Sequence, residues 1–207
     1  MKLVNRLKGK IKRHRNAYRK QKHLKKMGKA YGVDFGGYLS KEKLELEPFE
    51  GCAYEASFDL PVIVKRLQIT PDDCFIDIGC GKGYAMHYFA SLPFGKIAGI
   101  EIKEELAKIA RDNLKTLYPE DSRFEVIVGD VCKYTDYDEY NYFYLYNPLT
   151  RVGISKFVAH LRESLERSPR NVWVIYQNPR FWDEFTKEEL FNAVISADRS
   201  LILKHQK

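Results

Sequence analysis

The chain has 207 residues, of which 44% are hydrophobic and 30% are charged, and its formal net charge is +7. This length fits one compact domain with a short appendage, and the hydrophobic content suffices for a buried core, which excludes a wholly disordered chain. No apolar run in the sequence approaches the length of a membrane-spanning helix.

The positive charge is concentrated at the N-terminus. Residues 1–29 contain 13 lysines and arginines and no acidic residue, so the other 178 residues hold 22 basic and 28 acidic side chains. Any preference for an anionic partner therefore belongs to this arm, because the rest of the chain is mildly acidic. The apolar residues of the arm fall on one side of a predicted amphipathic helix, which we expect Gly28 to end; they are Leu3, Val4, Leu7, Ile11 and Tyr18.

The sequence predicts three segments: a basic amphipathic arm at 1–29, a connection at 30–53 and a domain at 54–207. The arm fits an anionic membrane surface or nucleic acid, and its apolar stripe slightly favours the membrane. A solvated tail without a partner is the alternative. The four cysteines form no C-x-x-C pair, which favours a reduced, cytoplasmic protein that the arm could hold at a membrane.

Short apolar runs alternate with segments of helical periodicity from about residue 57 onward. This alternation predicts a parallel sheet covered by helices on both faces, with a seventh strand that could be antiparallel. The predicted strands are 74–78, 96–101, 124–128, 141–146, 171–176, 191–196 and 200–204, and the predicted helices lie near 60–67 and at 84–92, 104–117 and 154–165.

A glycine loop follows the first predicted strand. It has the pattern Asp77-x-Gly79-x-Gly81-x-Gly83, with Cys80 inside it. Glycines allow a tight turn and a close approach of backbone to ligand. The spacing differs from the G-x-G-x-x-G loop of nicotinamide-dependent oxidoreductases. Ligands of such sheets bind beyond the carboxyl ends of the strands, so the loop marks a candidate site.

The loop resembles motif I of the class I methyltransferases, D-x-G-x-G-x-G, and the likeness extends over roughly residues 54–205. It implies a Rossmann-like domain that uses S-adenosylmethionine, with Asp77, Gly79, Cys80, Gly81 and Gly83 around the cofactor. It also implies that Glu101, after the second strand, accepts the ribose hydroxyls and that Asp130, after the third, contacts the adenine amino group. Within the superfamily, the chain resembles small bacterial methyltransferases of undefined substrate.

The fourth predicted strand ends at Tyr146-Asn147-Pro148-Leu149. Asn147 and Pro148 partly resemble the (D/N/S)-P-P-(Y/F) motif of amino-group methyltransferases, in which the Asn side chain accepts a hydrogen bond from the target amine. The second proline and the aromatic residue are missing, so a nucleobase acceptor does not follow. Tyr146 could contact the acceptor. The alternative is a turn that only shapes the wall of the site.

Each site residue also has a structural interpretation, since Asp77 could cap a turn and Glu101 could be a surface carboxylate. Two other functions stay open: a non-catalytic S-adenosylmethionine-binding or scaffolding protein, and, less favoured, a nicotinamide-dependent oxidoreductase. No cluster has metal-ligand spacing, so we expect no metal. The sequence identifies a cofactor but not a methyl acceptor.

Overall fold

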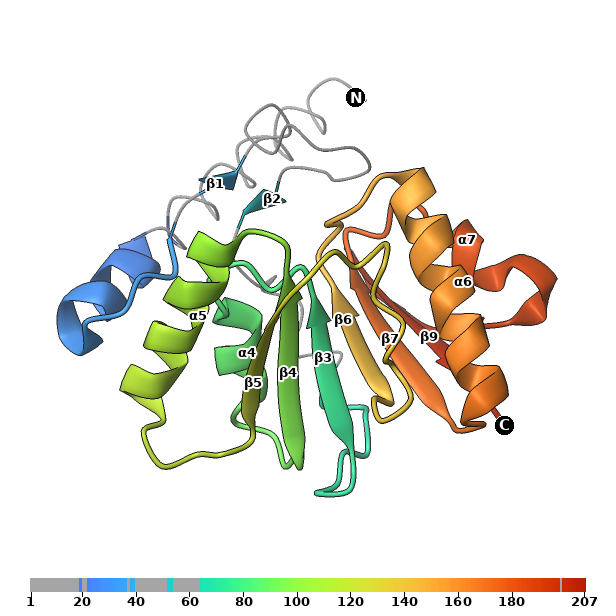
Figure 1. Ribbon diagram of the computed structural model, residues 1–207, viewed down its shortest axis with the longest axis horizontal. Helices are drawn as coiled ribbons and strands as arrows, with labels where there is room; N and C mark the ends of the chain where they lie inside the picture. The colour runs from blue at the N-terminus through green and yellow to red at the C-terminus, as the bar shows by residue number, and fades with distance from the viewer. Residues whose placement is uncertain (1–18, 20–21, 37, 40–51, 54–63, 198) are drawn as a thin grey trace, which may run out of the picture.

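A computed structural model describes residue 19 and residues 22–36, 38–39, 52–53, 64–197 and 199–207 (Figure 1). Its centre is a seven-stranded sheet in the order β5-β4-β3-β6-β7-β9-β8. The first five strands in this order are parallel, and β9 runs antiparallel to both β7 and β8. The predicted Rossmann-like, mostly parallel sheet with an antiparallel strand is confirmed.

The seven strands of this sheet and the three longer helices agree with the predicted ranges to within about three residues at each end. The two-residue strands, the four-residue helix and the 3-10 turn were not predicted. The strands are β1 (Tyr38–Leu39), β2 (Cys52–Ala53), β3 (Cys74–Ile78), β4 (Lys96–Glu101), β5 (Phe124–Val128), β6 (Tyr142–Leu145), β7 (Val172–Gln177), β8 (Asn192–Ala197) and β9 (Ser200–His205). The helices are α4 (Tyr84–Phe89), α5 (Glu104–Leu117), α6 (Arg151–Arg167), α7 (Asp183–Thr186) and a 3-10 turn at Lys187–Glu189. The first half of the predicted helix near 60–67, residues 60–63, lies outside the described residues.

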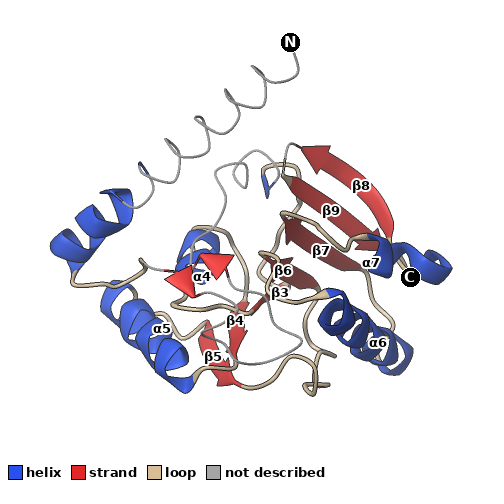
Figure 2. Cartoon of the chain, turned by 90° about the horizontal axis from the view of Figure 1, so that it is seen from above, coloured by secondary structure: helices blue, strands red, loops and turns tan. Residues whose placement is uncertain are grey.

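Helices cover both faces of the sheet, with α4 and α5 on one side and α6 on the other (Figure 2). Strand β3 shows the consequence, because its side chains alternate between two hydrophobic clusters. Ile76 and Ile78 pack in the cluster with α6, and Phe75 packs in the cluster with α4. A strand buried on both faces explains why the sequence shows a continuous apolar run there.

The first described helix continues through Gly28 and ends at Tyr31, so the expected stop at Gly28 is wrong. Gly32 makes the turn instead, with φ of +71° and its N–H donating to the Gly28 carbonyl oxygen at 2.9 Å. Gly28 has a packing role, because a Cβ there would lie 2.8 Å from the carbonyl oxygen of Val33. The stripe from Leu3 to Tyr18 lies outside the described residues.

The chain after Gly32 returns along the body of the protein. Leu24, Val33 and Phe35 form a small buried cluster, with Leu117 of α5 packed against it. In Figure 1 the first described helix lies beside α5. The hairpin of β1 and β2 lies above the carboxyl edge of the parallel strands in the same view. No helix in the described part of the chain is long and apolar enough to cross a membrane.

Candidate active site at the carboxyl edge of the sheet

The glycine loop connects β3 to α4 at the carboxyl edge of the sheet. The N–H groups of Gly79 and Cys80 both donate to the carbonyl oxygen of Ile100 at the end of β4, at 2.9 and 3.0 Å. Gly79, Gly81 and Gly83 all have positive φ, which a side chain would strain. The loop is therefore held against β4 in a backbone conformation that depends on glycine.

Glu101 links this loop to the end of β4. Its Oε2 accepts the N–H of Gly81 at 2.9 Å, and its Oε1 accepts the N–H of Lys103 at 2.9 Å. The side chain is only 7% exposed. A carboxylate has about four acceptor positions, so Glu101 can still accept a hydrogen bond from a ligand.

Asp77 and Glu101 form a buried acidic pair. Burial raises the pKa of the Asp77 carboxyl well above its usual range, and the charge of Glu101 raises it further. Burial also raises the pKa of Glu101, against the opposing hydrogen bonds from Lys103 and Gly81. Two desolvated carboxylates of like charge favour a ligand that brings a positive charge and hydrogen-bond donors.

Asn147 and Pro148 lie against the glycine loop from the neighbouring strand. A Cβ on Gly79 would approach the Pro148 Cβ to 2.9 Å, so the two turns are in direct contact. Asn147 is 6% exposed and has φ of +48°. Tyr146 is half-buried beside it. The structure thus brings the residues after β6 to the same edge as Asp77 and Glu101.

Two other expected cofactor contacts have structural roles as well. The Cys80 side chain is buried in the cluster with α4, so only the backbone of Cys80 is available to a ligand at the loop. Asp130 Oδ1 accepts the N–H of Cys132 at 2.8 Å, and its other oxygen lies 3.6 Å from Lys133 Nζ. Asp130 remains partly exposed after β5, next to the strand that carries Glu101.

The sequence interpretation missed a set of polar contacts that attaches residues 33–36 to the glycine loop. Lys82 Nζ lies 2.6 Å from Asp34 Oδ2 and donates to the Gly36 carbonyl oxygen at 2.7 Å. Buried Asn113 accepts the N–H of Asp34 at 2.8 Å and donates to the carbonyl oxygens of Asp34 and Lys82. An Asn on the apolar face of a predicted helix was the signal for this contact.

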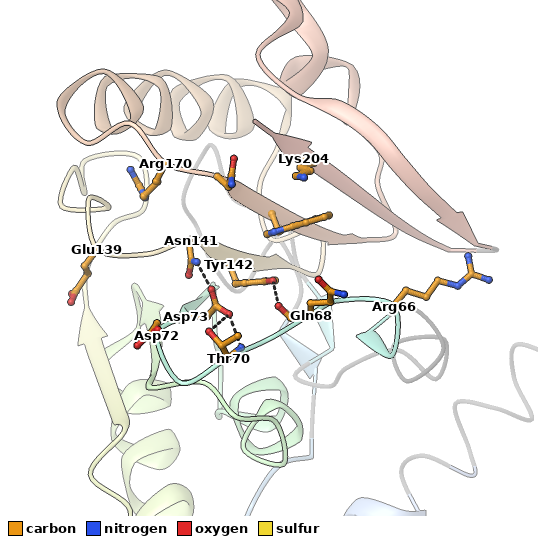
Figure 3. A pocket seen from close by; sticks show the side chains of 12 residues that line it. Arg66, Gln68, Thr70, Asp72, Asp73, Glu139, Asn141, Tyr142, Arg170 and Lys204 are labelled. Carbon is orange, nitrogen blue, oxygen red and sulfur yellow. Dashed lines mark hydrogen bonds between the residues drawn. The ribbon is translucent and has the colours of Figure 1, made fainter. Parts of the chain in front are cut away.

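A hollow with a volume of about 740 Å³ lies at the opposite edge of the sheet (Figure 3). Its polar groups largely hold the protein together: Asn141 bonds to Cys74 and Asp73, and Arg170 donates to carbonyl oxygens including that of Tyr140. Lys204 lies over the ring of Trp173. Ligands of parallel sheets bind at the carboxyl edge, so this hollow is not the candidate site.

Within the described residues, no group of three or more His, Cys, Asp or Glu side chains is arranged to hold a metal ion.

Comparison with known proteins finds a match for the part of the chain that carries this edge. Residues 69–163, which contain the glycine loop, Glu101 and Asn147, match the family model of a methyltransferase domain. Cyclopropane-fatty-acyl-phospholipid synthase of Escherichia coli K12 is 34% identical over 83 residues, which are 35% of this chain. The chain spans 22% of the length of that curated relative.

Solved structures show the same fold at low sequence identity. A SAM dependent methyltransferase from Aquifex aeolicus has a TM-score of 0.54 at 14% identity, covering 72% of this chain and 90% of that one. A protein from Pyrococcus horikoshii has a TM-score of 0.53 at 15% identity, covering 71% and 86%. Residues 69–163 of this chain thus match a methyltransferase domain, and its sheet has the fold of these solved structures.

Proposed function

We propose that this protein transfers a methyl group from S-adenosylmethionine to an acceptor bound beside Asn147. The observation that carries the proposal is the pair of buried carboxylates, Asp77 and Glu101, on either side of the glycine loop. The pair is acidic and desolvated, and both residues lie within the part of the chain that matches a methyltransferase domain.

The residues at this edge fit the cofactor chemically. S-adenosylmethionine carries an ammonium group and a sulfonium, and its ribose offers two hydroxyl donors. Asp77 and Glu101 supply acceptors and negative charge, and the glycines allow the positive φ angles of the loop that follows Asp77. Asp130, after the neighbouring strand, is the candidate for the adenine amino group.

The sulfonium supplies an activated methyl group, so the task of the protein is to align an acceptor with it. The turn at Asn147 and Pro148 is the candidate for this alignment, because it packs directly on Gly79 of the cofactor loop. Tyr146 stands beside that turn and would form part of the wall of the acceptor site.

Calorimetry with S-adenosylmethionine, S-adenosylhomocysteine and NAD tests the choice of cofactor. We expect binding of the first two and no binding of NAD, because the loop lacks the dinucleotide spacing. Binding of NAD without a response to S-adenosylmethionine would instead support an oxidoreductase.

Incubation of the protein with methyl-labelled S-adenosylmethionine and a lysate tests the transfer. The lysate is fractionated into protein, nucleic acid, lipid and saccharide, and we expect label in one fraction. Cofactor binding with no label in any fraction would favour the non-catalytic, scaffolding alternative.

We further propose that residues 1–29 bring the protein to an anionic membrane surface from the cytoplasm. The 13 basic residues favour anionic head groups, and the apolar stripe has no use in phosphate binding alone. The phospholipid in the name of the Escherichia coli relative agrees with this choice. Flotation with anionic vesicles over a salt series tests it, and binding to an oligonucleotide instead would assign the arm to nucleic acid.

A further inference from the structure

A tyrosine at the end of β7 reaches the turn that follows β6. The hydroxyl of Tyr176 donates a hydrogen bond to Asn147 Oδ1, with an O–O distance of 3.3 Å. Both side chains are buried, at 0% and 6% exposed. Because β6 and β7 are neighbours in the sheet, the contact lies at the carboxyl edge, beside the candidate site.

The direction of this hydrogen bond follows from the chemistry of the two groups. Burial raises the pKa of Tyr176, so its proton stays on the oxygen at neutral pH. The Asn147 atom that it meets is the amide oxygen, which can only accept, so the hydroxyl of Tyr176 is the donor.

The backbone that carries the Asn147 side chain is held beside the glycine loop. Asn147 has φ of +48°, in the left-handed region, and the next residue, Pro148, packs against Gly79. The amide oxygen faces Tyr176, so the amide nitrogen, on the other branch of the planar group, points away from it. In the described part of the chain, Tyr176 is the partner found for this amide.

We propose that Tyr176 is a positioning residue, which fixes the Asn147 amide so that its nitrogen is the group presented to the methyl acceptor. The acceptor would then offer an oxygen atom to Asn147 Nδ2, in place of the amine N–H that an Asn of the amino-group methyltransferases receives. This inference rests on the proposed function, but the contact between Tyr176 and Asn147 can be tested without cofactor or acceptor.

The first test is NMR of the Asn147 side-chain amide in 15N-labelled free protein. The signal pair is assigned by its disappearance in Asn147→Asp. Tyr176→Phe removes only the hydroxyl and keeps the ring that packs edge-on against Phe185, with centroids 5.8 Å apart. We expect this variant to shift the Asn147 pair and to increase exchange of its two protons.

Tyr142→Phe is the matched control. Tyr142 is also buried and donates a bond of similar length, 3.4 Å, to the Gln68 carbonyl oxygen, but it lies at the opposite end of β6. We expect this control to leave the Asn147 signals unchanged. An Asn147 pair that is identical in wild type and Tyr176→Phe would overturn the proposal.

The second test uses labelled methyl transfer to the lysate fraction that accepts label. Asn147→Asp keeps an oxygen for Tyr176 but has no amide nitrogen, whereas Asn147→Ala lacks both. We expect both variants to lose roughly tenfold to hundredfold in turnover, with Tyr176→Phe between them and wild type. Calorimetry should show that all three bind S-adenosylmethionine as wild type does.

Wild-type turnover by Asn147→Asp, with Asn147→Ala impaired, would show that the oxygen is the active end of the side chain, against the proposal. Failure of the wild type to bind S-adenosylmethionine would refute the proposed function alone, because the NMR comparison would still decide the role of Tyr176.

Discussion

At the scale of single residues, Glu101 has two tasks that a substitution separates. Its oxygens hold the N–H groups of Gly81 and Lys103, and the same carboxylate is available to ribose hydroxyls. We expect Glu101→Ala to weaken S-adenosylmethionine binding by about 1–3 kcal/mol, the range for loss of a hydrogen bond to a charged group. Calorimetry measures this, with Glu105→Ala, an exposed neighbour on α5, as the control. An unchanged dissociation constant would place Glu101 outside the site.

Asp77 should make the stability of the free protein depend on pH. Its folded-state pKa is raised by burial and by Glu101, so folding favours the protonated form. The stability that protonated Asp77 contributes is fully present below its pKa in the unfolded chain. This stability is lost as the pH rises through its pKa in the folded protein. We therefore expect Asp77→Asn to melt higher than wild type at pH 8 without cofactor, with the difference shrinking at pH 5.

In the same variant, S-adenosylmethionine should raise the melting temperature by less than in wild type, because a neutral amide cannot compensate the charge of the ammonium group. Melting curves with and without cofactor at pH 5 and pH 8 compare Asp77→Asn with wild type under all four conditions. A variant that melts lower than wild type at pH 8 without cofactor would show that the ionised Asp77 is stabilised by a contact of its own.

The residues that could be predicted from sequence are those whose role depends on local position. Asp77 and Glu101 stand at the ends of short apolar runs, so their placement at one edge follows from strand order. Tyr176 could not be assigned to Asn147, because the two are 29 residues apart and meet only through the pairing of β6 with β7. The raised pKa values likewise depend on burial that only the folded chain creates.

At the scale of elements, α5 does more than cover the sheet. Through Asn113 it holds residues 33–36 against the glycine loop. We expect Asn113→Ala to destabilise the protein by about 1–3 kcal/mol, since it leaves buried polar groups without partners. Hydrogen exchange should quicken at the Asp34 amide, whose N–H donates to Asn113 Oδ1.

Asn113→Asp gives the matched comparison, because it keeps the acceptor for the Asp34 N–H and loses the two bonds donated to carbonyl oxygens. Its Asp34 amide should exchange more slowly than in Asn113→Ala. Equal exchange in wild type and Asn113→Ala would mean that other contacts hold residues 33–36 in place.

The strands were predicted well because each is a short apolar run between turn signals. The predicted stop at Gly28 was wrong because the local preference of glycine was outweighed by packing: its missing Cβ makes room for the Val33 carbonyl. Helix α7 was not predicted, since four residues are too few to show a helical period. Helix α6 begins at Arg151, three residues earlier than predicted. Its first turn includes Gly153, which is buried in the helix.

At the scale of the whole molecule, the question is where the arm ends and the body begins. The change in charge after residue 29 suggested a boundary there. The structure adds a packing observation, because Leu24 is 3% exposed and belongs to a cluster with Val33 and Phe35, against Leu117 of α5. A residue buried in this way contributes to the stability of the body even though it lies in the basic segment.

Two truncations distinguish a boundary before Lys22 from one after Lys29. We expect removal of residues 1–18 to leave the melting temperature unchanged, and removal of residues 1–29 to lower it, because the second deletion takes Leu24 away from Val33 and Phe35. Loss of a buried leucine costs about 2–5 kcal/mol, or roughly 5–15 °C in a chain of this size. Leu24→Ala in the full chain should reproduce most of that loss while keeping every charge of the arm.

If both truncated proteins melt alike and bind S-adenosylmethionine alike, the cluster at Leu24 adds nothing to the body, and the boundary after residue 29 is correct. If only the shorter deletion is tolerated, vesicle binding should be assigned with the 19–207 protein, because its body is intact and any lost affinity then belongs to residues 1–18.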